Sequence, residues 1–133
     1  MFTSVSRMTK VLIVGDQVDL RTTISTSLQR HGFKVSTAVD ARKGMTAYAK
    51  EVPEIAILDF ESLGDKCLET ATQMLCLRSS TKLIVLASRS ADLDGMERIG
   101  VDILLTKPFA LETLVESAIA LSKMKPPLNI VAK

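Results

Sequence analysis

Three side chains with complementary chemistry stand far apart in the sequence, at Asp16, Asp59 and Lys107. Two carboxylates held close together repel each other and so attract a divalent cation. Mg²⁺ suits such a site because it takes oxygen ligands and keeps several waters. A lysine ammonium adds a mobile point charge that can bind a phosphoryl oxygen. An aspartate, a metal ion and a lysine together can accept a phosphoryl group as an acyl phosphate.

Short apolar segments of the kind that forms buried parallel strands lead up to these residues. They lie at residues 10–14, 34–37, 54–58, 82–87 and 102–105. Between them, apolar residues recur at helical spacing, and in the first helix this pattern ends at Gly32, where a left-handed conformation is available. Five alternations of strand and helix predict an α/β fold, a parallel sheet with right-handed crossovers and helices on both faces.

The other helices are predicted from similar apolar spacings. These are Ala41, Met45 and Ala49; Leu68, Ala71, Leu75 and Leu77; Met96 and Ile99; and Leu111, Leu114, Val115, Ala118 and Leu121. In such folds, ligands collect at the carboxyl ends of the strands. Asp16, Asp59, Ser88 and Lys107 all follow strand ends, so we expect them on one rim. The alternative is that the aspartates cap helices and the lysine is solvated, but three such groups on one rim favour chemistry.

The composition and net charge limit the number of domains and the kinds of partner. The 133 residues can form one domain with its own core, and 17 Lys+Arg against 15 Asp+Glu give a net charge of only +2. Scattered basic residues and 4% aromatics argue against direct nucleic-acid binding. No apolar run approaches the roughly 20 residues that cross a membrane, and no secretory signal is evident, so we expect a cytoplasmic protein. We expect a disordered extension at 1–9, the domain at 10–124 and a tail or linker at 125–133.

Three motifs, in order, resemble those of the receiver domains of two-component response regulators. They are Val11-Leu12-Ile13-Val14-Gly15-Asp16, Ile55-Ala56-Ile57-Leu58-Asp59 and Leu105-Thr106-Lys107-Pro108-Phe109. The resemblance covers about residues 9–123. It implies a flavodoxin-like sheet of order 2-1-3-4-5, and a phosphoryl group received from a histidine kinase or phosphotransfer protein. It also implies contacts with a downstream protein, or a homodimer, through the surface of the fourth and fifth helices.

The resemblance also implies roles for individual residues. Asp59 would be the phosphoacceptor, and Lys107 would contact the phosphoryl group. Asp16, Asp59 and the backbone carbonyl of Glu61 would bind Mg²⁺. The Lys107–Pro108 peptide bond would be cis, a form that is only about 0.5–1 kcal/mol less stable than trans before proline.

Several positions depart from the family pattern. Gly15 stands where a second acidic residue is usual, Ala87 where a Thr or Ser normally binds the phosphoryl group, and Leu104 where an aromatic residue is common. Ala87 can contact a phosphoryl group only through its backbone. Ser88 is adjacent, but strand alternation points it to the opposite face, so it would reach the group only after a local backbone change. These departures predict altered switching.

Two alternatives remain open at this stage. The chain is either a phosphorylated receiver or a pseudo-receiver that binds proteins without phosphorylation; an enzyme is not favoured, because no G-x-G-x-x-G or G-x-x-x-x-G-K-[ST] motif occurs. Glu61 and Arg89 should both project into the mouth of the site, from the loops after the third and fourth strands, and one hypothesis is an ion pair between them that partly screens Asp59. The alternative for that pair is two solvated side chains.

Overall fold

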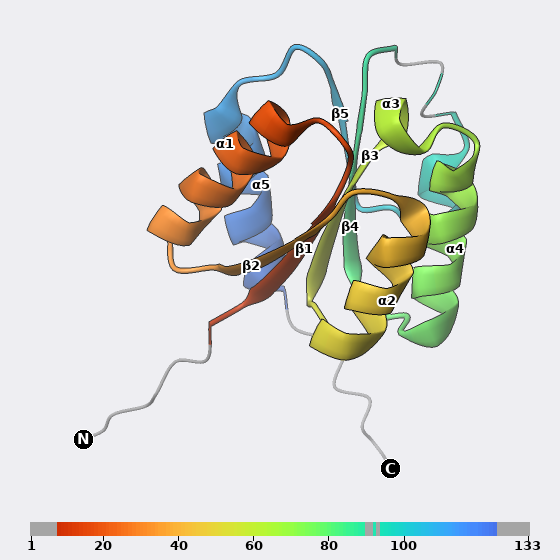
Figure 1. Cartoon of the computed structure of the whole chain (residues 1–133), viewed down its shortest axis with the longest axis horizontal. Coiled ribbons are helices and arrows are strands. Elements are labelled where there is room, and N and C mark those ends of the chain that lie inside the picture. Colours follow the sequence, from red (N-terminus) through yellow and green to blue (C-terminus); the bar gives the residue numbers. More distant parts are fainter. Residues whose placement is uncertain (1–7, 90–91, 93, 125–133) are drawn as a thin grey trace.

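A parallel five-stranded sheet forms the centre of the molecule, between two layers of helices (Figure 1). The computed structural model describes residues 8–89, 92 and 94–124. The strands are β1 (Lys10–Val14), β2 (Lys34–Ala38), β3 (Ile55–Asp59), β4 (Lys82–Ala87) and β5 (Ile103–Thr106). Their order in the sheet is β2-β1-β3-β4-β5. The predicted fold class and strand order are confirmed.

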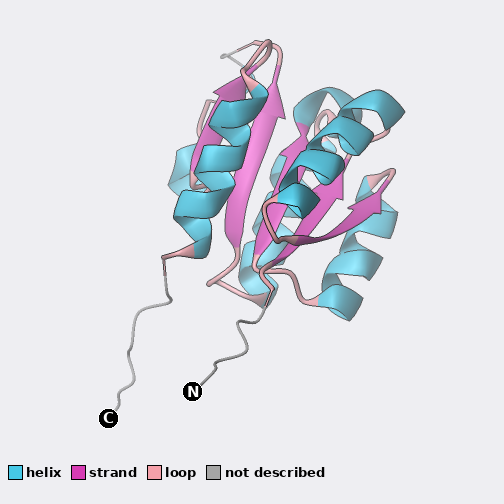
Figure 2. Cartoon of the chain, turned by 90° about the vertical axis from the view of Figure 1, so that its left-hand side faces the viewer, coloured by secondary structure: helices cyan, strands magenta, loops and turns pink. Residues whose placement is uncertain are grey.

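Helices cover both faces of the sheet. They are α1 (Val18–Arg30), α2 (Ala41–Glu51), α3 (Phe60–Leu63), α4 (Lys66–Leu77), the 3-10 helix η2 (Met96–Ile99) and α5 (Leu111–Ser122). Helices α1 and α5 lie on one face, and α2 and α4 lie on the other (Figures 1 and 2). Among the described residues, no helix is long and apolar enough to span a bilayer.

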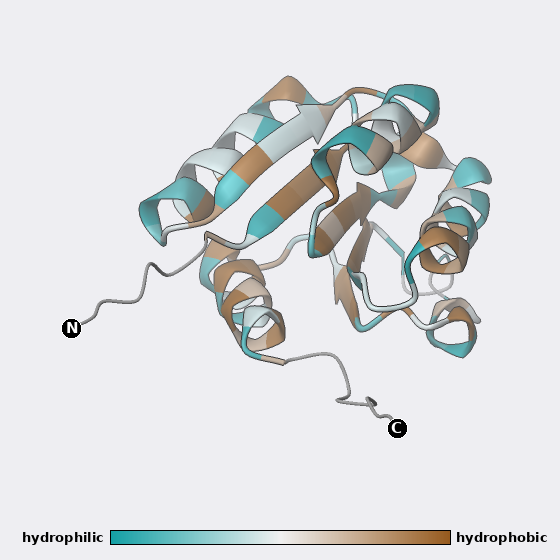
Figure 3. Cartoon of the chain, turned by 90° about the horizontal axis from the view of Figure 1, so that it is seen from below, coloured by the Kyte–Doolittle hydropathy of each residue, from teal (hydrophilic) through white to brown (hydrophobic). Residues whose placement is uncertain are grey.

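The core has two parts, one on each side of the sheet. Val11 and Ile13 of β1 pack with α1 and α5, whereas Leu12 and Val14 pack with α2 and α4. Apart from Lys10, Asp59 and Lys82 at their ends, the central strands β1, β3 and β4 are therefore apolar, as expected for parallel strands buried on both faces. Figure 3 shows central strands that are largely brown, with teal at some of their ends, between helices of mixed teal and brown.

The first helix ends where the sequence predicts. Gly32 has a φ of +91°, and the N–H of Phe33 donates to the Leu28 carbonyl at 3.1 Å. Backbone turns of this kind pair the last carbonyls of a helix. The following chain then enters β2 in register with β1, which places Lys34 opposite Lys10.

The segment predicted as the fourth helix is a single 3-10 turn in the described residues. Gly95 and Gly100, with φ values of +82° and +105°, border η2 on either side. Two left-handed residues this close leave no length for a regular helix. A second difference is α3, four residues long and not predicted, because so short an element carries no apolar period. The predicted extension at 1–9 and tail at 125–133 lie outside the described residues, except for Met8 and Thr9.

Candidate functional site

Asp59 is the last residue of β3 and lies at the carboxyl-terminal rim of the sheet. Its side chain is only 4% exposed. Its Oδ1 accepts the backbone N–H of Glu61 at 3.1 Å, so the carboxylate also caps the short helix α3. The cap that the sequence offered as an alternative to chemistry is therefore present, but it uses only one of the two carboxylate oxygens.

Lys107 follows β5 and reaches the same rim. Its Nζ donates to Oδ1 of Asp59 at 3.0 Å and to Oε1 of Glu61 at 2.8 Å. The backbone N–H of Lys107 donates to the Ala87 carbonyl at 2.7 Å, which fixes the start of the loop beside β4. The Lys107–Pro108 bond is cis, as predicted. The fold thus brings a lysine and an aspartate together across 48 residues of sequence.

These contacts keep the lysine and the glutamate charged. Burial lowers the pKa of Lys107, but the hydrogen bonds to Glu61 and Asp59 outweigh it and hold that pKa above its usual value. The hydrogen bond from Lys107 and then that from Ser88 hold the pKa of Glu61 below its usual value. The Lys107 and Asp59 side chains are only 16% and 4% exposed, so the ion pair between them is partly shielded from water, whereas the Glu61 side chain is 38% exposed and its pair with Lys107 is closer to a surface pair.

Asp16 stands on the same rim, at the end of β1. It is exposed, and its backbone N–H donates to Oγ of Ser62 at 2.6 Å, so the loop after β1 lies against α3. Its neighbour Gly15 lies close to Asp59: a Cβ atom added to Gly15 would lie 3.1 Å from Cβ of Asp59 and 3.5 Å from its Oδ2. The absence of a side chain at residue 15 is what allows this approach.

The second oxygen of Asp59 is an unusual feature of the rim. Oδ2 is buried and has no hydrogen-bond partner. A cavity of about 10 Å³, lined in part by Gly15, Gln17 and Arg21, adjoins this residue. A buried carboxylate oxygen without a partner is unfavourable. This atom is therefore suited to bind an added ligand.

The residues present fit Mg²⁺, although with fewer charges than usual. The Asp16 carboxylate, the free Oδ2 of Asp59 and the Glu61 carbonyl are all oxygen donors, the type that Mg²⁺ prefers. In the part of the chain that the structure describes, no cluster of three or more His, Cys, Asp or Glu side chains could hold a metal ion. Water would therefore supply much of the coordination shell of a cation bound here.

The predicted Glu61–Arg89 ion pair is wrong. Arg89 pairs with Asp92 instead, with its Nη2 and Nε at 2.8 and 3.2 Å from the two carboxylate oxygens. Asp92 is only three residues from Arg89, so two hydrogen bonds form between them at a small cost in conformational entropy. Glu61 turns to Lys107, a less exposed cation than Arg89, whose side chain is 76% exposed.

The structure also places the two β4 residues that the sequence singled out. The Ala87 side chain is fully buried in the core, and only its carbonyl reaches the rim, where it holds the Lys107 backbone. Ser88 lies beyond the end of β4, so strand alternation no longer determines its direction. Its hydroxyl donates to Oε2 of Glu61. Sequence reasoning missed the resulting Lys107–Glu61–Ser88 network, although a glutamate two residues after Asp59 was a signal for it.

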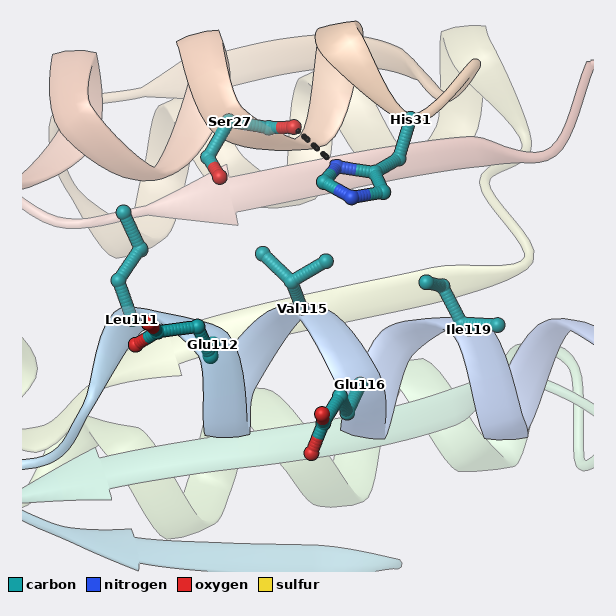
Figure 4. A pocket seen from close by; sticks show the side chains of 7 residues that line it. All are labelled: Ser27, His31, Leu111, Glu112, Val115, Glu116 and Ile119. Carbon is teal, nitrogen blue, oxygen red and sulfur yellow. Dashed lines mark hydrogen bonds between the residues drawn. The ribbon is translucent and has the colours of Figure 1, made fainter.

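A larger groove lies between α1 and α5 and has none of the rim residues in its lining (Figure 4). Its volume is about 540 Å³, and its lining residues are Ser27, His31, Leu111, Glu112, Val115, Glu116 and Ile119. The His31 ring is hydrogen-bonded through Nδ1 to the Ser27 carbonyl at 2.9 Å, one turn earlier in α1. The only histidine thus caps the end of a helix. The groove contains no Asp–Lys arrangement like that of the rim.

Comparison with known proteins identifies the family. The family model for the response regulator receiver domain matches residues 11–119. The chain belongs to the response regulator receiver family. Members of this family are signalling domains of two-component systems, and phosphorylation with Mg²⁺ is a general property of them. Receiver domains interact with histidine kinases or phosphotransfer proteins.

Named relatives agree with this assignment. The transcriptional regulatory protein PrrA of Mycobacterium bovis is 29% identical over 119 residues, which cover 87% of this chain and 51% of PrrA. The virulence transcriptional regulatory protein PhoP of Salmonella typhimurium is 30% identical over 118 residues, which cover 87% of this chain and 53% of PhoP. The chain therefore spans about half the length of the curated relatives it matches.

Solved structures show the same receiver fold. The chemotaxis response regulator CheY4 of Vibrio cholerae superposes with a TM-score of 0.75 at 26% identity, over 86% of this chain and 99% of CheY4. The BeF3-activated receiver domain of DrrB gives a TM-score of 0.78 at 24% identity, over 89% of this chain and 100% of that domain. The second likeness concerns the fold alone.

Proposed function

We propose that this receiver accepts a phosphoryl group on Asp59, with Mg²⁺, from a histidine kinase or phosphotransfer protein. One observation carries the proposal. Asp59 is buried, one of its oxygens is held by Lys107 and the Glu61 N–H, and the other has no partner. A carboxylate with a purely structural role would have both oxygens paired.

The chain's own residues would act mainly by positioning and by charge. An oxygen of Asp59 forms the new P–O bond, while the bond from phosphorus to the donor's histidine nitrogen breaks and its electron pair stays on that nitrogen. Lys107 holds the carboxylate in place and offers a positive charge to the phosphoryl oxygens. Mg²⁺, bound by Asp16, Asp59 and the Glu61 carbonyl, would neutralise further negative charge.

The output of this receiver would differ from the usual one. Ala87 has no hydroxyl, and Leu104 is a half-buried aliphatic residue packed against the core. The surface formed by η2, β5 and α5 is the proposed contact for a downstream protein or for a homodimer. We place these partners and the domain in the cytoplasm, and we assign this chain no direct contact with nucleic acid or membrane.

A second candidate function is that of a pseudo-receiver, a protein-binding module that works without phosphorylation. The observation that favours it is the Glu61 carboxylate bound to Lys107 and Ser88, because both donors are then already engaged. The glycine at residue 15 favours it as well, since it removes one potential metal ligand.

Phosphorylation of the isolated chain distinguishes the two functions. The chain is incubated with Mg²⁺ and acetyl phosphate, and intact mass is measured over time, for the wild type, for Asp59→Asn and for the control Asp65→Asn. Asp65 is exposed and its side chain makes no cap hydrogen bond. Addition of one phosphoryl group to the wild type and the control, but not to Asp59→Asn, supports a phosphorylated receiver. No addition to any of the three supports the pseudo-receiver.

A further inference from the structure

The Glu61 side chain has partners that a surface glutamate does not normally have. Its Oε1 accepts from Lys107 Nζ at 2.8 Å, and its Oε2 accepts from the Ser88 hydroxyl. Both donors lie at the carboxyl-terminal rim, after β5 and after β4. One carboxylate thus bridges the ends of two neighbouring strands.

The position of this carboxylate relative to Asp59 is equally specific. The same Lys107 ammonium contacts Oε1 of Glu61 and Oδ1 of Asp59, at 2.8 and 3.0 Å. The two carboxylates therefore lie next to each other, separated by one cation. An anionic group joined to Asp59 would have to use the same lysine, so it would meet Glu61 there.

We propose that the Glu61 carboxylate is a built-in occupant of the position that the phosphoryl group takes on this domain. This inference rests on the proposed function. The Glu61 carboxylate binds Lys107 and Ser88 as two phosphoryl oxygens would, and it must leave both residues before Asp59 can be phosphorylated. Glu61 is then an intramolecular competitor of the phosphoryl group for this position.

The chain connectivity makes such a competitor effective. Glu61 is two residues from Asp59 and lies in the first turn of α3, so its local concentration at the rim is high. Its side chain is 38% exposed, which means that it can rotate out into solvent without moving the core. Its contacts with Lys107 Nζ and with the Ser88 hydroxyl make occupancy the resting condition, and release requires no unfolding.

The same contact defines a role for the Ser88 hydroxyl in binding the incoming group. Ala87 cannot offer a side-chain hydrogen bond, but the Ser88 hydroxyl is already at the rim and already bound to an anionic group. When Glu61 leaves, this hydroxyl is free to donate to whatever anion replaces it. Ser88 is thus a positioning residue for the incoming group.

The test is binding of beryllium fluoride, which with Mg²⁺ imitates an aspartyl phosphate. Amide spectra are recorded as beryllium fluoride is added to the wild type, to Glu61→Ala, to Glu61→Gln and to the control Glu69→Gln. Glu69 is an exposed glutamate on α4, so its variant loses the same charge away from the rim. Both variants of Glu61 keep the backbone carbonyl that is expected to bind the metal.

We expect half-saturation at about tenfold lower beryllium fluoride for Glu61→Ala, since a charge-assisted contact with Lys107 no longer competes. Glu61→Gln should lie between Glu61→Ala and the wild type, because the amide can still accept from Ser88 but has lost its charge. Glu69→Gln should bind like the wild type. Thermal unfolding of each variant checks that the fold is intact, and Glu61→Gln provides the answer where Glu61→Ala is unstable.

The outcomes separate this inference from the proposed function. Equal binding by the wild type and both Glu61 variants, or weaker binding by the variants, overturns the inference and leaves phosphorylation of Asp59 standing. Saturation by none of the proteins overturns both. Tighter binding by Glu69→Gln to the same extent as by Glu61→Ala attributes the gain to net charge alone, which also overturns the inference.

Discussion

The ammonium group of Lys107 lies 3.0 Å from Oδ1 of Asp59, and both side chains are largely shielded from water. The backbone of Lys107 is fixed independently, by the hydrogen bond to the Ala87 carbonyl. The lysine is therefore already in place before any phosphoryl group arrives. A charge positioned in advance needs no reorganisation during the reaction, and this is the main way a protein can assist phosphoryl transfer.

Removal of this charge should affect stability and phosphorylation together. In Lys107→Ala, the Asp59 carboxylate stays buried without its cation, and we expect the free energy of unfolding to fall by about 1–3 kcal/mol. Phosphorylation by acetyl phosphate should slow by about tenfold or more. Urea unfolding and intact-mass kinetics measure the two effects. Lys43→Ala is the control, since Lys43 is exposed on α2; an equal loss in both variants would contradict the assigned role of Lys107.

Gly15 offers a way to test the metal site. In Gly15→Asp, the new Cβ would lie 3.1 Å from Cβ of Asp59, and the new carboxylate would join those of Asp16, Asp59 and Glu61 at the rim. Without Mg²⁺ we expect a loss of about 1–3 kcal/mol in stability, from crowding and like-charge repulsion. Mg²⁺ should then raise the melting temperature of this variant more than that of the wild type.

Gly15→Ala is the matched control for that experiment. It introduces the same crowding at Asp59 but no carboxylate, so its melting temperature should respond to Mg²⁺ as the wild type does. An equal response of the aspartate and alanine variants to Mg²⁺ would show that no cation binds beside residue 15. CaCl₂ in place of MgCl₂ tests whether the site is selective.

Much of the fold could be predicted because buried parallel strands leave a plain pattern in the sequence. Each observed strand lies within one residue of its predicted bounds, since its apolar run ends where the chain reaches the rim. Glycine also marked the end of α1 correctly. The short elements α3 and η2 could not be predicted in form, because a single turn has no periodicity and its conformation depends on the neighbouring loops.

The site likewise has features that could be predicted from the sequence and contacts that could not. That Asp16, Asp59 and Lys107 share one rim follows from the rule that parallel strands end together. The partner of Glu61 does not follow from any such rule, because its side chain and that of Ser88 stand beyond the strands. Which cation a glutamate binds there depends on distances between loops, and the sequence predicted Arg89 where the structure has Lys107.

The pair of Arg89 and Asp92 should be dispensable. Arg89 is highly exposed, its contact is local, and exposed pairs contribute little to stability. We expect Arg89→Ala and Arg89→Glu to leave the melting temperature and the lifetime of the acyl phosphate close to wild-type values. Phosphate release after rapid removal of acetyl phosphate measures that lifetime. A change of several-fold in either variant would mean that Arg89 reaches the rim during the reaction.

The contact between Glu61 and Lys107 should give stability a defined pH dependence. The pKa of Glu61 is lowered in the folded protein from its ordinary value of 4.5, so its contribution is fully present above that value and is lost as pH falls through the lower folded pKa. The pKa of Lys107 is raised from 10.5, so its contribution is present below that value and is lost as pH rises through the higher folded pKa. The groups that face Glu61 are Lys107 and Ser88, with Asp59 on the far side of the ammonium.

The measurement is the difference in unfolding free energy between the wild type and Glu61→Gln, obtained by urea titration across this pH range. The difference should be constant around neutral pH, should shrink as pH falls below about 4.5, and should shrink again above about 10.5. Other acidic groups titrate in both proteins and cancel in the difference. Glu69→Gln, whose carboxylate is exposed, supplies the baseline. A wild-type advantage that persists unchanged into acid would mean that Glu61 and Lys107 are not paired in solution.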